Sequence, residues 1–162
     1  MTTFRTKITG LLDQHNIPYR LLPHSEPVFT IEAAAAQRGV VREEMVKSIL
    51  LKEKKGRYVM ACLPGDARLD PKAVRAQMGG DWKRLTFAAE DEIQQITGSV
   101  QGAVAPLCLP DGVPVIFDET LAHLENVNIS TGHPMAGLEM KAQDLIRLAG
   151  AQLAPISQEE SS

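Results

Sequence analysis

Two apolar runs joined by a short polar turn place the strongest limit on how this chain can fold. Residues 45–53 read MVKSILLKE and residues 58–64 read YVMACLP, with the charged segment KKGR between them. Short runs rich in aliphatic and β-branched residues, separated by a polar turn that contains glycine, predict a β-hairpin. The chain therefore contains a sheet, and its other segments must pack against that sheet.

Helical and strand patterns surround the predicted hairpin. Thr30 is a suitable N-cap for a helix that stops at Gly39, and Asp70 followed by Pro71 opens another helix. Further helices are predicted over 3–16, from Thr86 or Ala88 to residue 98, and over 142–150, and strands over 17–24, 99–105, 113–119, 126–131 and 136–141. These patterns predict one α/β domain with a mixed, largely antiparallel sheet flanked by helices.

The domain is predicted to span residues 1–154, and the polar segment 155–162, PISQEESS, is predicted to be a disordered tail. The net charge of −3 argues against a protein that binds nucleic acid with its whole surface, although it leaves room for a local basic patch. No apolar run approaches the roughly 18 residues that a membrane span needs, and the N-terminus does not have the pattern of a signal peptide.

The two cysteines and four histidines do not form a motif. Cys62 and Cys108 each lie inside an apolar run, which is typical of reduced core thiols in a cytoplasmic protein rather than of a disulfide framework. The histidines have no metal-binding spacing, so we expect no metal and no cofactor. A monomer is the default expectation for a chain of 162 residues.

Lys47 is unusual because it lies inside an apolar strand. Strand alternation places Lys47, Ile49 and Leu51 on one face and the intervening residues on the other. An ammonium group held against apolar walls would stabilise a phosphate or a developing oxyanion. The alternative is a lysine at the rim of the sheet whose head group reaches water.

The segment GAVAP, residues 102–106, is the second candidate feature. Gly102 permits a close backbone approach, and Pro106 ends a strand because it lacks an N–H group. Between them, Ala103, Val104 and Ala105 offer short side chains and backbone amides that would suit a small ligand. The alternative is an ordinary bulge or strand end.

Three segments, MVKSILL, TGSVQGAVAPL and NISTGHPMAGLEMKAQDLI, in this order and spacing, resemble the YbaK/prolyl-tRNA-synthetase-associated editing-domain family over roughly residues 3–148. The G-x-x-x-P loop of that family matches Gly102 and Pro106, and its key lysine falls on Lys47. The resemblance implies a YbaK-like fold and a free-standing protein that hydrolyses the ester of a small amino acid mischarged on tRNA.

The resemblance also implies roles for individual residues. The catalytic candidates are Lys47, which would hold the terminal phosphate or the ester, and the loop from Gly102 to Pro106, which would hold the aminoacyl group. The terminal ribose 2′-hydroxyl would assist the attacking water. An aminoacyl ester is already reactive, so orientation and charge stabilisation suffice without a metal or a strong nucleophile.

Substrate contacts are expected from the loop and from the later turn STGHP, and the candidates are Ala103, Val104, Ala105, Ser130, Thr131, Gly132 and His133. Ala103 and Ala105 are expected to limit the size of the amino acid, so that the pocket acts as a sieve. Asp118 lies at the end of a predicted strand and is interpreted as a helix cap rather than as an acid catalyst. Alanine, serine, threonine and cysteine all remain candidate substrates.

The expected partner is mischarged tRNA, with an aminoacyl-tRNA synthetase as a second candidate and with no membrane or DNA. A basic cluster on the predicted hairpin, formed by Lys52, Lys54, Lys55 and Arg57, would neutralise backbone phosphates. Its alternative interpretation is a solvated hairpin tip.

Two other functions remain open. A non-catalytic paralogue would bind tRNA or a synthetase without hydrolysis. A helix-turn-helix DNA-binding protein is the other alternative, because Ala35 and Gly39 have a suitable spacing in TIEAAAAQRGVVREEMVKSIL. Against it, the supposed recognition helix begins with acidic residues and continues as a β-branched apolar run.

Overall fold

The computed structural model describes residues 5–158 and confirms the predicted hairpin. Strand β2 (Val46–Glu53) runs antiparallel to β3 (Tyr58–Pro64), with Lys47 opposite Leu63 and Lys52 opposite Tyr58. The alternation along β2 is also as predicted. Val46 and Leu50 enter one apolar core, whereas Ile49 and Leu51 face a second core on the other side of the sheet.

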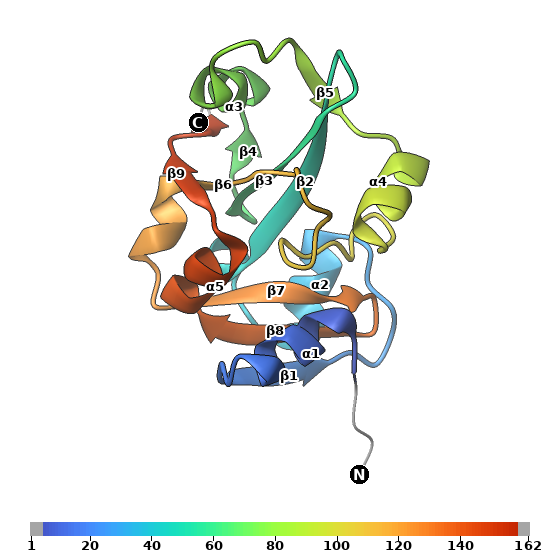
Figure 1. Cartoon of the computed structure of the whole chain (residues 1–162). Coiled ribbons are helices and arrows are strands. Elements are labelled where there is room, and N and C mark those ends of the chain that lie inside the picture. The colour runs from blue at the N-terminus through green and yellow to red at the C-terminus, as the bar shows by residue number, and fades with distance from the viewer. Residues whose placement is uncertain (1–4, 159–162) are drawn as a thin grey trace.

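The strands form three sheets rather than one (Figure 1). A five-stranded sheet has the order β5-β2-β3-β6-β9, in which β6 runs parallel to both β3 and β9 while the other pairs are antiparallel. An antiparallel three-stranded sheet has the order β1-β8-β7, and β10 pairs with β4. The remaining strands are β1 (Tyr19–Pro23), β4 (Arg68–Leu69), β5 (Leu85–Phe87), β6 (Val115–Asp118), β7 (Asn126–His133), β8 (Ala136–Lys141), β9 (Gln152–Ala154) and β10 (Ser157–Gln158).

The helices begin and end largely where their capping residues predict. The Thr30 hydroxyl accepts a hydrogen bond from the Ala33 amide at 3.1 Å, and Gly39 ends that helix in the left-handed conformation with a φ of 67°. Asp70 caps the next helix by accepting from the Lys72 amide. The helices are α1 (Lys7–Gln14), α2 (Ile31–Arg38), α3 (Pro71–Met78), α4 (Glu90–Thr97), α5 (Ala142–Ala149) and the short 3-10 helices η1 (Arg42–Glu44) and η2 (Glu119–His123).

The helices bury apolar surface on both sides of the five-stranded sheet. On one side, α1, α5 and the inner face of the three-stranded sheet build the larger core, whose members include Leu12, Phe117, Ile129 and Leu145. On the other side, α3 contributes Val74 to a smaller core. The predicted mixed α/β class is therefore confirmed.

Two predicted segments are wrong in detail. Residues 99–105 form a turn rather than a strand, because Gly102 has a positive φ and the Ala103 amide bonds back to the Val100 carbonyl. Helix α4 begins at Glu90 rather than at Thr86 or Ala88, since Leu85–Phe87 instead add strand β5 to the edge of β2.

The predicted disordered tail is wrong for residues 155–158. Ile156 is fully buried in the smaller core, and Ser157–Gln158 pair with β4. The remaining tail residues, 159–162, lie outside the described part of the chain.

The helix-turn-helix alternative is wrong, because the segment after α2 contains only the single 3-10 turn η1 and then enters strand β2. Within residues 5–158, no helix is long and apolar enough to cross a membrane.

Candidate functional site

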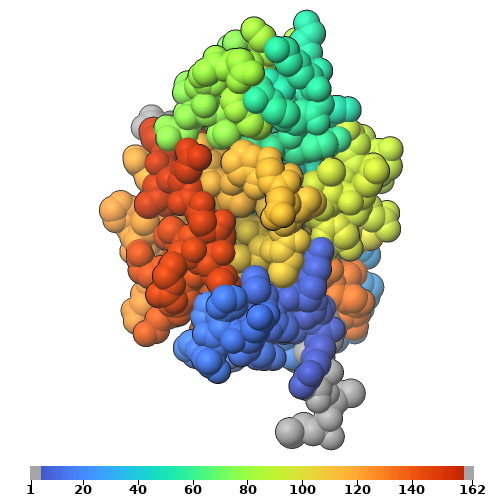
Figure 2. All heavy atoms as spheres, in the orientation of Figure 1, coloured from blue at the N-terminus to red at the C-terminus, as the bar shows by residue number. Residues whose placement is uncertain are grey.

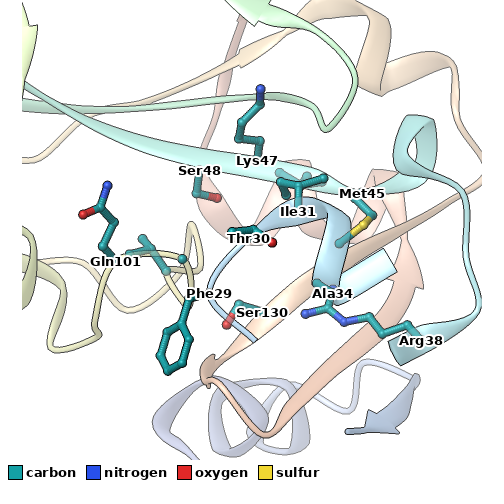
Figure 3. Close-up of a pocket in the computed structure, with 13 residues that line it drawn as sticks. Phe29, Thr30, Ile31, Ala34, Arg38, Met45, Lys47, Ser48, Gln101 and Ser130 are labelled. Atoms are coloured by element: carbon teal, nitrogen blue, oxygen red, sulfur yellow. The ribbon is translucent and has the colours of Figure 1, made fainter. Parts of the chain in front are cut away.

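A small cavity of about 220 Å³ lies between α2, the first half of β2, the 99–106 loop and β7 (Figure 3). Strand β5 pairs with β2 only from Leu51 onward, so it leaves the edge of β2 uncovered at this point. Phe29, whose side chain is exposed, is one of the lining residues. The lining residues are Phe29, Thr30, Ile31, Ala34, Arg38, Met45, Val46, Lys47, Ser48, Gln101, Gly102, Val104 and Ser130.

Gly102 allows the loop to approach the segment that precedes α2. Its φ is +88°, and a Cβ atom at this position would lie only 2.2 Å from the carbonyl oxygen of Phe29. A side chain is therefore excluded on two grounds, backbone conformation and space. The expected close approach at Gly102 is present, and it forms one wall of the cavity.

The other loop residues divide between the cavity and the protein interior. Val104 lines the cavity, whereas Ala103 and Ala105 are only 1% and 4% exposed and do not line it. Pro106 lines a different groove, next to Leu107. The structure thus places Val104, rather than the two alanines, in the wall of the cavity.

Only Ser130 of the four candidates in the later turn lines the cavity. Its hydroxyl donates to the Ala103 carbonyl at 2.7 Å and accepts from the Gly132 amide at 2.9 Å, which fixes the loop to β7. Thr131 is fully buried and donates to Ala136, and His133 is exposed outside the cavity, where its ring accepts from the Met135 amide. These contacts stabilise the turn.

Lys47 lies where the cavity meets a neighbouring groove and lines both. Its ammonium donates a hydrogen bond to the Ala67 carbonyl at 2.7 Å. In Figure 3 the side chain points away from Thr30 and Ser130, while the Ser48 hydroxyl points toward the cavity from the other face of β2. The position of Lys47 is thus at the rim of the cavity rather than at its base.

Arg38 is the main site residue that the sequence interpretation missed. It occupies the last turn of α2, one helical turn after Ala34, and it lines the cavity. Its Nε donates to His24 Nε2 at 3.1 Å, and the other ring nitrogen of His24 lies 2.8 Å from the Pro134 carbonyl. Because a carbonyl only accepts and the arginine nitrogen only donates, His24 is the neutral tautomer protonated at Nδ1.

The fixed position of Arg38 depends on a glycine in β8. A Cβ atom at Gly137 would lie 2.1 Å from the guanidinium carbon, so the side chain can cross the sheet only where no Cβ is present. The sequence signal for this site was an arginine on the apolar face of α2, in register with Ile31 and Ala34.

The cavity carries a fixed positive charge. Burial lowers the pKa of Arg38 to about 10, which leaves the guanidinium protonated at neutral pH. Burial also lowers the pKa of His24; the Pro134 carbonyl opposes this shift and the charge of Arg38 adds to it. In the described part of the chain no carboxylate forms an ion pair with Arg38.

Neither cysteine is suited to nucleophilic attack. Burial raises the pKa of the Cys62 thiol to about 12 and also raises the pKa of Cys108, so both are protonated at neutral pH. Asp118 caps η2 and accepts hydrogen bonds from the amides of Ile156 and Ser157, which agrees with a structural role. Among residues 5–158, no three His, Cys, Asp or Glu side chains gather as they would around a metal ion.

The predicted basic cluster on the hairpin separates into two kinds of residue. Lys52 pairs with Glu92 at 2.7 Å, and Arg57 binds the buried carboxylate of Glu53 with two hydrogen bonds of 2.9 and 2.6 Å. Lys54 and Lys55 are exposed at the turn. Lys52 and Arg57 thus already hold carboxylates, whereas the turn lysines are available to an external anion.

Comparison with known proteins identifies the family. The model of the aminoacyl-tRNA editing domain matches residues 25–148, so the chain belongs to that family. Prolyl-tRNA editing protein ProX of Acetoanaerobium sticklandii is 28% identical over 149 residues, which cover 89% of each chain. Multifunctional Ser/Thr-tRNA deacylase ProXp-y of Escherichia coli is 25% identical over 151 residues, covering 91% of this chain and 89% of ProXp-y. The crystal structure of the hypothetical protein APE2540 superposes with a TM-score of 0.86 at 28% identity, covering 94% of this chain and 100% of that chain.

Proposed function

We propose that this protein acts in trans as an aminoacyl-tRNA deacylase and hydrolyses the ester of a small amino acid mischarged on tRNA. The observation that carries the proposal is the small cavity that is lined by both the half-buried, fixed guanidinium of Arg38 and the Gly102 loop. Membership of the editing-domain family supports it, as do the names of ProX and ProXp-y. A tRNA free of its synthetase would be the substrate.

The proposed chemistry needs orientation more than reactive groups. The cavity holds the aminoacyl group, with the Gly102–Val104 wall on one side and Ser48 on the other. The oxygen of a water bonds to the ester carbon, negative charge develops on the carbonyl oxygen, and the ribose oxygen leaves with a proton to give the free amino acid and tRNA. Positive charge from Arg38 in a poorly solvated cavity stabilises that developing charge.

Lys47 and the ribose take the remaining roles in this proposal. The Lys47 ammonium at the rim of the cavity is placed to meet the phosphate of the terminal nucleotide while the ester enters the cavity. The adjacent 2′-hydroxyl orients the water. Proton transfer through the substrate itself agrees with the high thiol pKa values of both cysteines.

The test is release of amino acid from tRNAs charged with Ala, Ser, Thr, Cys or Pro. We expect wild-type protein to release one or two small amino acids, and Lys47→Ala to lower that rate by about 100-fold, as expected when the phosphate contact that positions the ester is lost. Lys141→Ala, at an exposed position outside the cavity, is the matched control and retains wild-type rates. A folded wild-type protein that releases no amino acid would instead support the non-catalytic paralogue.

Val104 is expected to set the size of the amino acid that is accepted. Val104→Ala enlarges the cavity and should raise kcat/KM for the larger members of the panel, such as Thr, relative to Ala by about 10-fold or more, since one or two methylene groups in a pocket contribute about 1–3 kcal/mol. Ala103→Gly removes a methyl group that does not line the cavity and serves as the comparison. Equal preferences in wild type and Val104→Ala would contradict this assignment.

A further inference from the structure

Positive charge is concentrated in one part of this acidic chain. Residues 52–84 contain nine Lys and Arg against four Asp and Glu, whereas the rest of the chain contains eight against sixteen. The net charge of −3 therefore hides a segment with an excess of five positive charges. Such an asymmetry is the electrostatic signature of a surface that binds a polyanion.

The fold brings these charges together at one end of the molecule. Helix α3, strand β5 and the β2–β3 turn form this end, which is the green and teal upper part of Figures 1 and 2. The Lys54 amide bonds to the Arg84 carbonyl at 3.1 Å, so the hairpin turn lies directly beside the segment that leads into β5. Lys54, Lys55, Lys72, Lys83 and Arg84 are exposed, and within the described chain none of them forms an ion pair.

Two grooves with shared lining residues lie between this basic end and the cavity. The first, of about 680 Å³, is lined by Lys72, Arg75 and Arg84, and we call it the α3 groove. The second, of about 510 Å³, contains Phe87 and Arg68, and we call it the Phe87 groove. Pro71 and Gln158 line both grooves, and Lys47 lines both the Phe87 groove and the cavity. The three hollows thus adjoin one another at shared lining residues, and we call them together the track.

Phe87 gives the middle of the track an unusual surface. Its side chain is 63% exposed although it stands on a strand, opposite Leu51 in the register of β5 and β2. An exposed aromatic ring on a rigid strand, inside a groove that also contains arginine, is the arrangement on which unpaired nucleic-acid bases stack. Double-stranded nucleic acid offers no free base for such a contact.

Two of the three acidic residues along the track are already engaged in the fold or paired. Asp70 in the α3 groove caps helix α3 through the Lys72 amide, and Glu32 in the Phe87 groove pairs with Arg42 at 3.5 Å. Asp66 is the remaining carboxylate of the Phe87 groove. The balance over the two grooves remains positive, with Lys47, Arg42, Arg68, Lys72, Arg75 and Arg84 against these three acids.

We propose that this track binds the single-stranded 3′ end of tRNA, with a base stacked on Phe87 and the preceding phosphates held by Lys72 and Arg84 at the α3 groove. The inference rests on the proposed function, because it takes the cavity as the place where the terminal aminoacyl group enters. In this proposal the tRNA contacts mainly α3 and the segment that leads into β5. Lys52 and Arg57 contribute less, because they already bind carboxylates.

The phosphate contacts are tested by the salt dependence of binding to uncharged tRNA. In the double variant Lys72→Ala/Arg84→Ala, the affinity at low salt should fall by about 10-fold or more. The negative slope of log K against log salt should also become shallower by roughly 1.4 to 1.8, because each lost phosphate contact removes about 0.7 to 0.9 from its magnitude. The control Lys141→Ala/Arg147→Ala removes two exposed cations outside the track and should keep the wild-type slope. An unchanged slope in Lys72→Ala/Arg84→Ala would overturn the proposal.

The stacking contact is tested with a short single-stranded RNA that ends in CCA. Phe87→Ala should weaken its binding by about 10-fold or more, since stacking on one aromatic side chain contributes that much. Leu153→Ala removes a 44% exposed apolar side chain on β9 and should not change it. Equal affinities of wild type and Phe87→Ala for this RNA would overturn the placement of the 3′ end.

The same variants separate this inference from the proposed function. If wild-type protein binds tRNA through the track but releases no amino acid, the deacylase proposal fails and the track stands. If wild type releases amino acid while the track variants retain full tRNA affinity, the deacylase proposal stands and the track is wrong. Hydrolysis of an aminoacyl-adenosine, which lacks the upstream phosphates, should be unaffected by Lys72→Ala/Arg84→Ala.

Discussion

Gly102→Ala is expected to reduce deacylation by at least about 100-fold, because a displacement of about 1 Å at a reacting group has a cost of this order. The added Cβ atom would lie 2.2 Å from the Phe29 carbonyl oxygen, so either the loop or the segment before α2 must move. The loop contributes Val104 to the lining of the cavity, and the segment before α2 contributes Thr30. The measurement is kcat/KM on the preferred aminoacyl-tRNA.

Gly112→Ala is a matched control for this variant. Gly112 has a φ of +89°, almost the same as the +88° of Gly102, but a Cβ atom there would meet nothing within 4 Å. The control therefore shares the unfavourable left-handed backbone and lacks the collision. Equal activity of the two variants would show that the contact with Phe29 does not shape the site, and thermal unfolding of both variants separates lost activity from lost structure.

Asp118→Ala is expected to lower the free energy of unfolding by about 3 kcal/mol, which is typical of leaving several buried hydrogen-bond donors without a partner. The carboxylate is 1% exposed and accepts from the amides of Ile156 and Ser157 as well as from the Thr120 hydroxyl. The C-terminal strand β10 depends on these contacts. Urea denaturation measures the change, and a loss below about 0.5 kcal/mol would contradict the role.

Asp118 also makes a definite contribution to the pH dependence of stability. Burial raises its pKa, but the hydrogen bonds from Thr120, Ile156 and Ser157 outweigh burial, so the pKa in the folded protein lies below the ordinary value of 3.8. A carboxyl group with a lowered pKa stabilises the fold above its unfolded pKa, and this contribution is lost as the pH falls through the folded value. The stability difference between wild type and Asp118→Asn should therefore shrink below about pH 4.

The elements that the sequence predicts well are those with local signals. The hairpin follows from two apolar runs and a polar turn, and α2 follows from Thr30 and Gly39 at its ends. Strand β5 was missed because its three residues gain stability only by pairing with the distant edge of β2. The order of strands in the three sheets depends on contacts between distant segments, which no local pattern encodes.

The residues of the candidate site also divide into those that a local sequence pattern predicts and those that depend on distant contacts. Lys47 and Gly102 stand out in the sequence because each is unusual in its surroundings, and both line the cavity. The role of Arg38 could not be predicted, since it requires that Gly137 and His24, more than a hundred residues apart, meet beside the last turn of α2. The prediction that Ala103 and Ala105 line the pocket was wrong, because residues 99–105 form a turn. A turn, unlike a strand, does not present alternate residues to one side.

The uncovered edge of β2 directs neighbouring side chains to two different hollows. Ser48 points to the cavity from one face of the strand, and the side chain of Lys47 leaves from the other face beside the groove that contains Phe87. Substitutions at well-separated positions that share no partner change the free energy nearly independently. In the proposed function, residues of the cavity such as Val104 select the amino acid and residues of the grooves such as Phe87 hold the tRNA. Substitutions in the cavity could then change the amino acid that is removed while the tRNA contacts stay the same.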